Sequence, residues 1–350
     1  RSSYSFGVLL ETGPQGKIHQ GIGPQLVVGQ RSFIAPTKTF KDSLDVEIAG
    51  VKMRLIYAPS ETDDEIIVWL PEQKLLQTAE VIQGETFPNV HTLRGTAYRD
   101  PVKWFKTIDA MRRLQPEHIA PSHGRPMSGK DKIEEMLTAY RDAIQYVHDQ
   151  TVRQMNKGLT PDEIAEIVAQ LPPHLAGHPW LGEFYGTVKH SVRQIYQGYL
   201  GWFNGDPTGW LASNFMNCSA GTMSSLAAPE IMQQLPLSKF FEAMTVRLDP
   251  LKSADAHLTV VFKIADTNET YAIEVRRGIA QVHEGLPAKV DATLSISLAT
   301  MQKLIARQLT LAGALQSGEV KVQGSVALLT RFYGFFDPLT TPEPPPLTIR

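Results

Sequence analysis

Apolar residues in the first 128 positions follow the two-residue period of β-strands and are separated by turn residues. The predicted strands are residues 25–29, 44–50, 51–59, 65–71, 74–81 and 118–123. Pro71, Glu72 and Gln73 separate two of them, which indicates a β-hairpin. One helical segment, residues 100–115, interrupts the series. Because the strands carry continuous apolar runs, we expect sheets that are covered by helices.

The apolar period changes from two residues to between three and four after residue 128. The side chains that share one face of the first predicted helix are Ile133, Leu137, Tyr140, Ile144 and Val147. Gly158 is a natural end for this helix. Thr160, Pro161 and Glu163 form a capping box that predicts the start of a second helix. A third helical segment covers residues 183–203, so this middle region is predicted to be all-helical.

Strand-like periods return after a Gly-, Pro- and Ser-rich linker at residues 204–230. The predicted strands of this region are residues 243–250, 256–266, 269–278, 280–285 and 292–298. A helix is predicted over residues 298–308, and a mixed segment at residues 318–336 precedes a Pro-rich tail. We therefore expect a separate, compact α+β domain at this end of the chain.

The charge balance narrows the range of partners. The chain carries 34 basic and 36 acidic residues and has no Lys- or Arg-rich run, so its charge does not indicate binding to nucleic acid or to a membrane surface. No apolar stretch approaches the roughly 20 residues of a membrane-spanning helix. Cys218 is the only cysteine, which excludes an internal disulfide and a thiolate metal cage. We expect a small-molecule ligand, and any metal would be held by His and carboxylate.

Three candidate metal ligands lie at or just past the C-terminal end of a predicted strand: Glu61, Glu80 and His123. Layered α/β folds carry functional residues on such loops, because the scaffold fixes them while the loop exposes them. Carboxylates with an imidazole are the ligand set of a hydrolytic zinc site. The alternative is a solvated turn at residues 60–65, whose acids cap backbone N–H groups, with His123 as a hydrogen-bonded structural residue.

Two arginines follow the strand that ends near Glu80. Arg94 and Arg99 indicate an anionic substrate, because a guanidinium matches the oxygens of sulfate, phosphate or carboxylate. The alternative for both arginines is a surface ion pair with Asp100, which the sequence favours slightly more for Arg99 than for Arg94. His19 and His91 are possible pocket residues, whereas a packing or capping role is predicted for the histidines of the helical region.

Several longer runs resemble one family. They are AEVIQGETFPNVHTLRGTAYRDPVKW, PSHGRPMSG, YRDAIQYVHDQTVR, NKGLTPDEIAE, EFYGTVKHSVRQIYQGYLGWFNGDP and GEVKVQGSVALLTRFYGFFD. These resemble the alkyl sulfatases of the metallo-β-lactamase superfamily, which include dodecyl-sulfate hydrolases. The resemblance implies the later part of an αββα metallo-β-lactamase-like catalytic domain at residues 1–128. It also implies an all-α dimerisation domain at 129–215 and an α+β sterol-carrier-protein-like domain at 222–345.

The resemblance also assigns roles to individual residues. Glu61 falls on a ligand of the first zinc, although the commoner PGTEAPAE of the family is replaced here by PSETDDE. Glu80 falls on the glutamate that bridges both zinc ions, and His123 on a ligand of the second. Arg94 falls on a sulfate contact. Asp63, Asp64 and Glu65 are then left as turn residues or as residues that support the ligands.

One family motif does not occur in the chain. The HxHxDH motif, which supplies most of the remaining zinc ligands, occurs nowhere in the 350 residues, and three donors are too few for two metal ions. The chain begins at Arg1 without Met and soon enters an apolar run. We therefore expect the later part of a longer polypeptide, or a first half that is supplied by another chain.

The function implied by the resemblance is zinc-dependent hydrolysis of alkyl sulfate esters by a homodimer, with two Zn²⁺ per site. The C-terminal domain would hold or deliver the aliphatic chain, and the resemblance favours a periplasmic or secreted protein. One alternative is a lipid- or sterol-binding carrier whose hydrolase half is incomplete or inactive. Another alternative is an enzyme that has the same metal site but hydrolyses a different ester, such as an aryl sulfate or a phosphate monoester.

Overall fold

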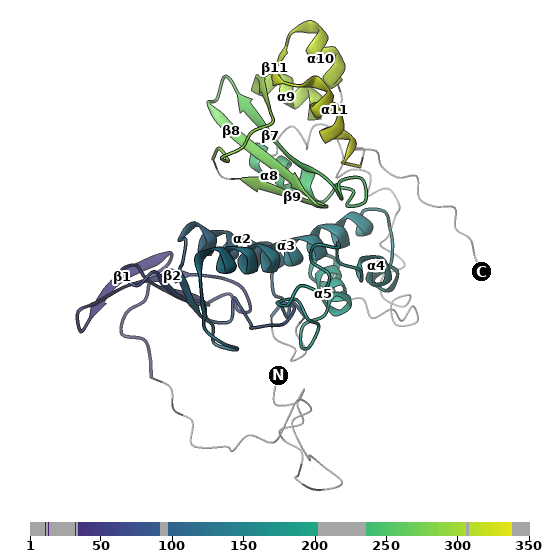
Figure 1. Ribbon diagram of the computed structural model, residues 1–350. Coiled ribbons are helices and arrows are strands. Elements are labelled where there is room, and N and C mark those ends of the chain that lie inside the picture. Colours follow the sequence, from purple (N-terminus) through teal and green to yellow (C-terminus); the bar gives the residue numbers. More distant parts are fainter. Residues whose placement is uncertain are drawn as a thin grey trace. The chain divides into compact units, whose positions relative to one another are not determined.

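The computed structural model in Figure 1 describes residues 34–91, 97–201, 236–283, 285–305 and 308–337, together with Glu11, Gly13 and Ser32. The chain divides into two compact units. The first comprises Arg1–Ile144 and His178–Gly198, and the second comprises Gln145–Gly177 and Tyr199–Arg350. No helix in the described part of the chain is both long and apolar enough to cross a membrane.

The first unit contains a six-stranded sheet in which the strands lie in chain order. These strands are β1 (Ser43–Ile48), β2 (Val51–Tyr57), β3 (Ile66–Leu70), β4 (Leu75–Gln77), β5 (His118–Ala120) and β6 (Met127–Ser128). All neighbours pair antiparallel except β4 and β5, which are parallel and need a crossover. The helix α2 (Pro101–Arg113) supplies that crossover. The hairpin predicted around Pro71–Gln73 is the β3–β4 pair.

One face of the central strands carries buried apolar side chains. Ile67, Leu76 and Ile119 lie on this face and are at most 1% exposed. The helix α2 begins at Asp100, whose side chain accepts hydrogen bonds from two N–H groups of the first turn. Its Trp104 is completely buried and donates from Nε1 to the Val81 carbonyl. This contact fixes the helix against the segment that follows β4.

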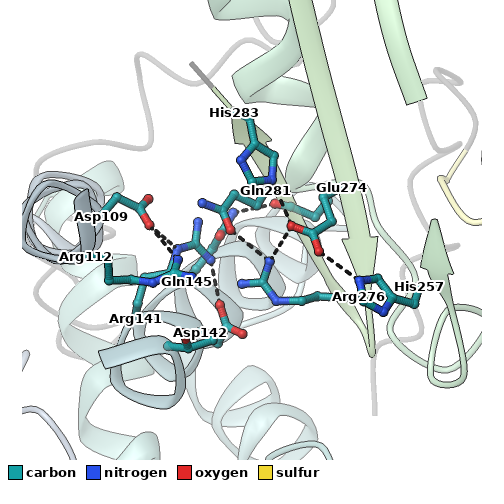
Figure 2. A network of polar contacts seen from close by, with 12 residues as sticks. Asp109, Arg112, Arg141, Asp142, Gln145, His257, Glu274, Arg276, Gln281 and His283 are labelled. Atoms are coloured by element: carbon teal, nitrogen blue, oxygen red, sulfur yellow. Dashed lines mark hydrogen bonds and ion pairs between the residues drawn. The ribbon is translucent and has the colours of Figure 1, made fainter. Parts of the chain in front are cut away.

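The helix α3 (Lys130–Met155) is joined to α2 by charged side chains. Arg141 is buried and donates to Asp109 of α2 at 3.0 Å and to Asp142 at 2.8 Å (Figure 2). Arg112 of α2 pairs with Glu134 of α3. A buried charge is tolerated only when it is paired, so these bonds specify how the two helices pack. The boundary between the two units falls within α3, after Ile144.

The two further helices of the middle region are present, and the last is shorter than the predicted residues 183–203. The helix α4 (Pro161–Val168) starts with the capping box of Thr160 and Glu163. Gly158 takes a positive φ of 81° after α3, a conformation that favours glycine. The helix α5 (Val188–Leu200) places Val188, Val192 and Ile195 in the interior.

The second unit contains a five-stranded sheet of order β11-β10-β7-β8-β9. Its strands are β7 (His257–Ile264), β8 (Glu269–Arg276), β9 (Ile279–His283), β10 (Ala292–Ile296) and β11 (Val320–Gly324). Only β10 and β7 are parallel. The helices of this region are α8 (Leu237–Thr245), α9 (Leu298–Ile305), α10 (Leu311–Ser317) and α11 (Val326–Gly334). Alternate residues of the strands share one apolar core with these helices, including Phe241, Phe262 and Phe332.

Two sequence predictions in this region are corrected. The strand predicted at 243–250 is wrong, because residues up to Thr245 belong to α8. Leu237, Phe241 and Met244 recur at helical spacing and are buried, and this period outweighs the strand propensity of Thr and Val. The helix α10 was not predicted, and the strand predicted at 25–29 lies outside the described residues.

A charged cluster lies on the face of β7–β9 opposite the apolar core (Figure 2). The carboxylate of Glu274 receives hydrogen bonds from His283 at 2.8 Å, from Arg276 at 3.0 Å and from His257 at 3.1 Å. Burial by itself would raise the pKa of Glu274. The hydrogen bond from His283 and the charge of Arg276 outweigh burial and lower the pKa to about 2.

The depressed pKa predicts how acid affects the second unit. Because the carboxylate is more acidic in the folded state, its stabilisation is complete above about pH 4.5 and is lost as the pH falls toward about 2. Glu274→Gln should lower the free energy of unfolding at pH 7 by roughly 2–3 kcal/mol and flatten its fall between pH 5 and about 2. Urea unfolding at several pH values measures both effects. The exposed Asp255→Asn is the control, and equal pH dependence in both variants would contradict the prediction.

Candidate functional site

Glu61 lies on the loop between β2 and β3. The loop is closed by a hydrogen bond from the Ala58 N–H to the Glu65 carbonyl at 2.9 Å. The Glu61 side chain is 13% exposed and forms an ion pair with the Arg99 guanidinium. Its other oxygen accepts a hydrogen bond from Gln83 Nε2 at 2.5 Å. The carboxylate of Glu61 is therefore held in one orientation by two fixed partners.

Glu80 lies on a tight turn directly after β4. The turn is closed by the Val81 N–H, which donates to the Thr78 carbonyl at 3.1 Å. Ala79 has a positive φ of 47°, a conformation that costs an L-residue roughly 1–2 kcal/mol. Its carbonyl accepts a hydrogen bond from the Ser122 N–H at 3.1 Å. The surrounding contacts thus hold a strained residue immediately before a candidate ligand.

His123 follows β5 and meets Glu80. Its Nε2 lies 2.6 Å from Oε1 of Glu80. The loops that carry the two residues also touch at Gly84 and Gly124, both of which have positive φ values. A Cβ on Gly124 would lie 3.1 Å from the Gly84 Cα. Glycine is required at this point because the two backbones lie against each other.

The carboxyl groups of Glu61 and Glu80 are hydrogen-bonded to each other. Burial is the main cause that raises the pKa of Glu61 to about 7, and the Glu80 carboxyl raises it further. The same hydrogen bond lowers the pKa of Glu80, with the contact to His123 acting in the same direction. Two carboxylates this close share a proton or a cation, since both cannot be ionised at low cost.

Arg99 lies inside the site. Its side chain is 8% exposed, and it donates to the Asn89 carbonyl as well as to Glu61. This burial contradicts the alternative of a surface ion pair with Asp100, whose own carboxylate caps α2. Arg94, the other predicted sulfate contact, lies outside the described residues, as does His19.

Further basic residues gather near Arg99. The rings of His91 and His190 are 5.1 Å apart, which brings α5 next to the loop that follows Gln83. Burial lowers the pKa of His91, and the charges of His190, Arg99 and Arg193 lower it further. The sequence placed His91 among possible pocket residues but gave His190 a packing role. No spacing along the chain could indicate this pair, because the fold alone brings the two residues together.

Gln83 is a site residue that the sequence did not single out. Its Nε2 donates to Glu61, while its Oε1 accepts from the Asn89 N–H at 2.7 Å. Its own N–H donates to the hydroxyl of Tyr140 in α3 at 3.3 Å. Gln83 therefore connects Glu61 to the loop that also positions Arg99.

The donor types fit zinc, but the arrangement does not make a binuclear centre. Among the described residues, no three or more His, Cys, Asp or Glu side chains are grouped so that they could hold a metal ion. His123, Glu80 and Glu61 instead form a chain of hydrogen bonds that ends at Arg99. Two zinc ions need more protein ligands than these three.

A cavity of about 220 Å³ borders Glu61. Its wall includes Asp63, Asp100, Tyr98 and Lys103, and the lysine is paired with Asp63 at 2.9 Å. The lining therefore carries more negative than positive charge. This cavity does not suit a sulfate group, in contrast to the basic residues around Arg99.

Comparisons with known proteins define the class of the chain. The family described as "Alkyl sulfatase dimerisation" matches residues 160–221, and "Alkyl sulfatase C-terminal" matches residues 225–342. A linear primary-alkylsulfatase of Pseudomonas sp. is 38% identical over 428 residues, which covers 96% of this chain and 81% of the relative. The chain therefore belongs to the alkylsulfatase family, whose curated members are sulfuric ester hydrolases.

More distant relatives agree with this assignment. An alkyl/aryl-sulfatase of Saccharomyces cerevisiae is 25% identical, and the match spans 96% of this chain and 65% of the yeast protein. A double mutant of the sec-alkyl sulfatase PisA1 shares the fold, with a TM-score of 0.50, 22% identity, and coverage of 97% of this chain and 67% of that one. The 428-residue match to the first relative exceeds the 350 residues of this chain, so that relative has residues within the matched span that this chain lacks.

The contact between Gly84 and Gly124 predicts the effect of a small substitution. Gly124→Ala should destabilise the first unit by about 2 kcal/mol, because the added methyl group strains the backbone and presses on Gly84. Urea unfolding measures the loss, and hydrogen exchange of the Ser122 amide should become faster.

Gly50→Ala is the matched control for this prediction. Gly50 has a similar φ of 81°, but a Cβ there meets nothing within 4 Å. Gly50→Ala should therefore lower the free energy of unfolding only through backbone strain, by about 1 kcal/mol. If both variants lose the same free energy of unfolding, the close approach of the two loops makes no contribution.

Proposed function

We propose that this chain takes part in the hydrolysis of alkyl sulfate esters to alcohol and sulfate, with Glu61, Glu80 and His123 as metal ligands. The observation that carries the proposal is the meeting of these residues, which come from three separate loops. Two adjoining carboxyl groups and an imidazole supply oxygen and nitrogen donors, and a metal cation would take the place of the proton that the two carboxyl groups otherwise share. The family membership supports the same reaction class.

Zinc is the metal we propose, because carboxylate and imidazole donors suit it and the sequence offers no thiolate pair. A bound zinc ion lowers the pKa of water to about 7 and withdraws charge from an ester oxygen. The described residues do not fill the coordination of two zinc ions, so the remaining ligands must come from elsewhere. Within this chain, Gln83 and Arg99 keep the Glu61 carboxylate turned toward Glu80.

Recognition of the sulfate group is assigned to basic residues. Arg94 remains the proposed direct contact. The positions of His91, His190 and Arg193 support an anion site near Arg99, because the His91 and His190 rings lie 5.1 Å apart and the charges of Arg99 and Arg193 both act on His91. The Arg99 guanidinium already binds Glu61 and the Asn89 carbonyl, which favours a role in holding the ligand over direct sulfate contact.

The C-terminal region is proposed to bind the aliphatic chain. We assign it a sterol-carrier-protein-like fold, supported by its five-stranded sheet and the helices that share its apolar core. The core of this region is apolar and includes Phe241, Phe262 and Phe332, which is the side-chain chemistry that an alkyl tail would require of its binding site. A homodimer through the helical region is proposed on the match to the dimerisation family.

A lipid carrier with an inactive hydrolase half is the second candidate. The observation that favours it is the lack of a metal-holding group among the described residues. Such a carrier would bind fatty ligands through the C-terminal region without stoichiometric zinc. Metal content therefore separates the two candidates.

Sulfate release from dodecyl sulfate by the full-length protein, supplied with zinc, tests the proposal. Glu80→Gln and His123→Ala should each lower the rate by at least about 100-fold, because each removes a ligand. Zinc content by mass spectrometry should fall in parallel. The control is Glu72→Gln, an exposed carboxylate in the β3–β4 turn.

The possible outcomes separate the candidates. Activity that survives both substitutions would show that these side chains are not the ligands. A full-length wild-type protein that binds fatty acid, holds no zinc and releases no sulfate would support the carrier instead.

A further inference from the structure

The carboxylate of Glu65 lies between the two loops that carry the candidate ligands. Its Oε1 accepts a hydrogen bond from the Glu80 N–H at 2.6 Å. Its Oε2 accepts one from the Glu61 N–H at 3.2 Å and another from the Ser60 hydroxyl. One side chain therefore binds the backbone of both candidate ligands, which lie 19 residues apart in the sequence.

The fold leaves this carboxylate little freedom. Glu65 directly precedes β3, and its own carbonyl closes the 58–65 loop by accepting from the Ala58 N–H. The Ser60 side chain that donates to it is 4% exposed. The Thr62 backbone also hydrogen-bonds to the carboxylate. A carboxylate accepts several N–H donors well, since it is acceptor-only and charge-assisted bonds are the stronger ones.

We propose that Glu65 is a positioning residue that sets the separation of Glu61 and Glu80. The inference rests on the proposed function only in treating those two residues as ligands. The mechanism is geometric: each oxygen of one planar group is attached to a different loop, so neither loop can shift without breaking a charge-assisted bond. The Glu61 and Glu80 carboxyl groups consequently stay within hydrogen-bonding distance of each other.

Two substitutions of Glu65 separate this role from a general contribution to folding. Glu65→Ala removes both acceptors and should speed hydrogen exchange of the Glu61 and Glu80 amides by at least about tenfold. Glu65→Gln keeps one carbonyl oxygen, so it should retain protection on one loop and lose it on the other. Amides of Ile67 in β3 and Trp104 in α2 should keep their wild-type rates in both variants.

Asp64→Asn is the matched control, because Asp64 is an exposed carboxylate in the same loop. It should leave all of these exchange rates unchanged. If Glu65→Ala leaves the Glu61 and Glu80 amides at wild-type rates, Glu65 does not position the loops. Uniformly faster exchange across the first unit would show that its role is only structural, and Glu65→Gln provides this test if the alanine variant does not fold.

A second measurement connects the positioning to metal binding. Calorimetric titration of the full-length protein with zinc chloride should show affinity about 10–100-fold weaker in Glu65→Ala than in the wild type. If the wild type binds no zinc, the proposed metal site is wrong, while the exchange rates still decide whether Glu65 positions the loops. Equal zinc affinity in the wild type and the alanine variant would overturn the positioning role.

Discussion

The close approach of two carboxyl groups, Glu61 and Glu80, is the constraint on which the rest of the candidate site depends. Like charges at hydrogen-bonding distance repel each other unless a proton or a cation lies between them. In the folded chain, the two carboxyl groups are surrounded by side chains that offset this repulsion. Arg99 provides positive charge to one carboxylate, and His123 provides a hydrogen bond to the other. Burial, reinforced by the neighbouring Glu80 carboxyl, raises the pKa of Glu61 to about 7.

This arrangement is built from backbone as much as from side chains. Glu61 and Glu80 lie on short loops at the ends of β2 and β4, and the β3–β4 hairpin between them brings the loops together. Ala79, with its strained positive φ, and the Glu65 carboxylate, which accepts a hydrogen bond from the Glu80 N–H, then fix the orientation of the loops. A pair of loops without these features would let the carboxyl groups move apart to relieve repulsion.

Much of the local structure could be predicted from the sequence, because the spacing of apolar residues and the capping residues determine where strands and helices form. The two-residue periods around residues 44–77 and the capping box at Thr160 correspond to elements of the structure. Placing Glu61, Glu80 and His123 at strand ends was also possible, since each follows an apolar run. The strand predicted at 243–250 failed because a helix-spaced set of apolar residues overlaps it. The contacts of Gln83 and His190 could not be predicted, since their partners are distant in sequence.

The meeting of Gly84 and Gly124 has a consequence for how the site varies and moves. Because backbone lies directly against backbone there, the spacing of these loops does not depend on any side-chain rotamer. Neighbouring positions such as Glu85 and Arg125 can therefore change in identity while the loops keep their spacing. Thermal displacement of one loop is also passed directly to the other, so Glu80 and His123 should fluctuate together as one body.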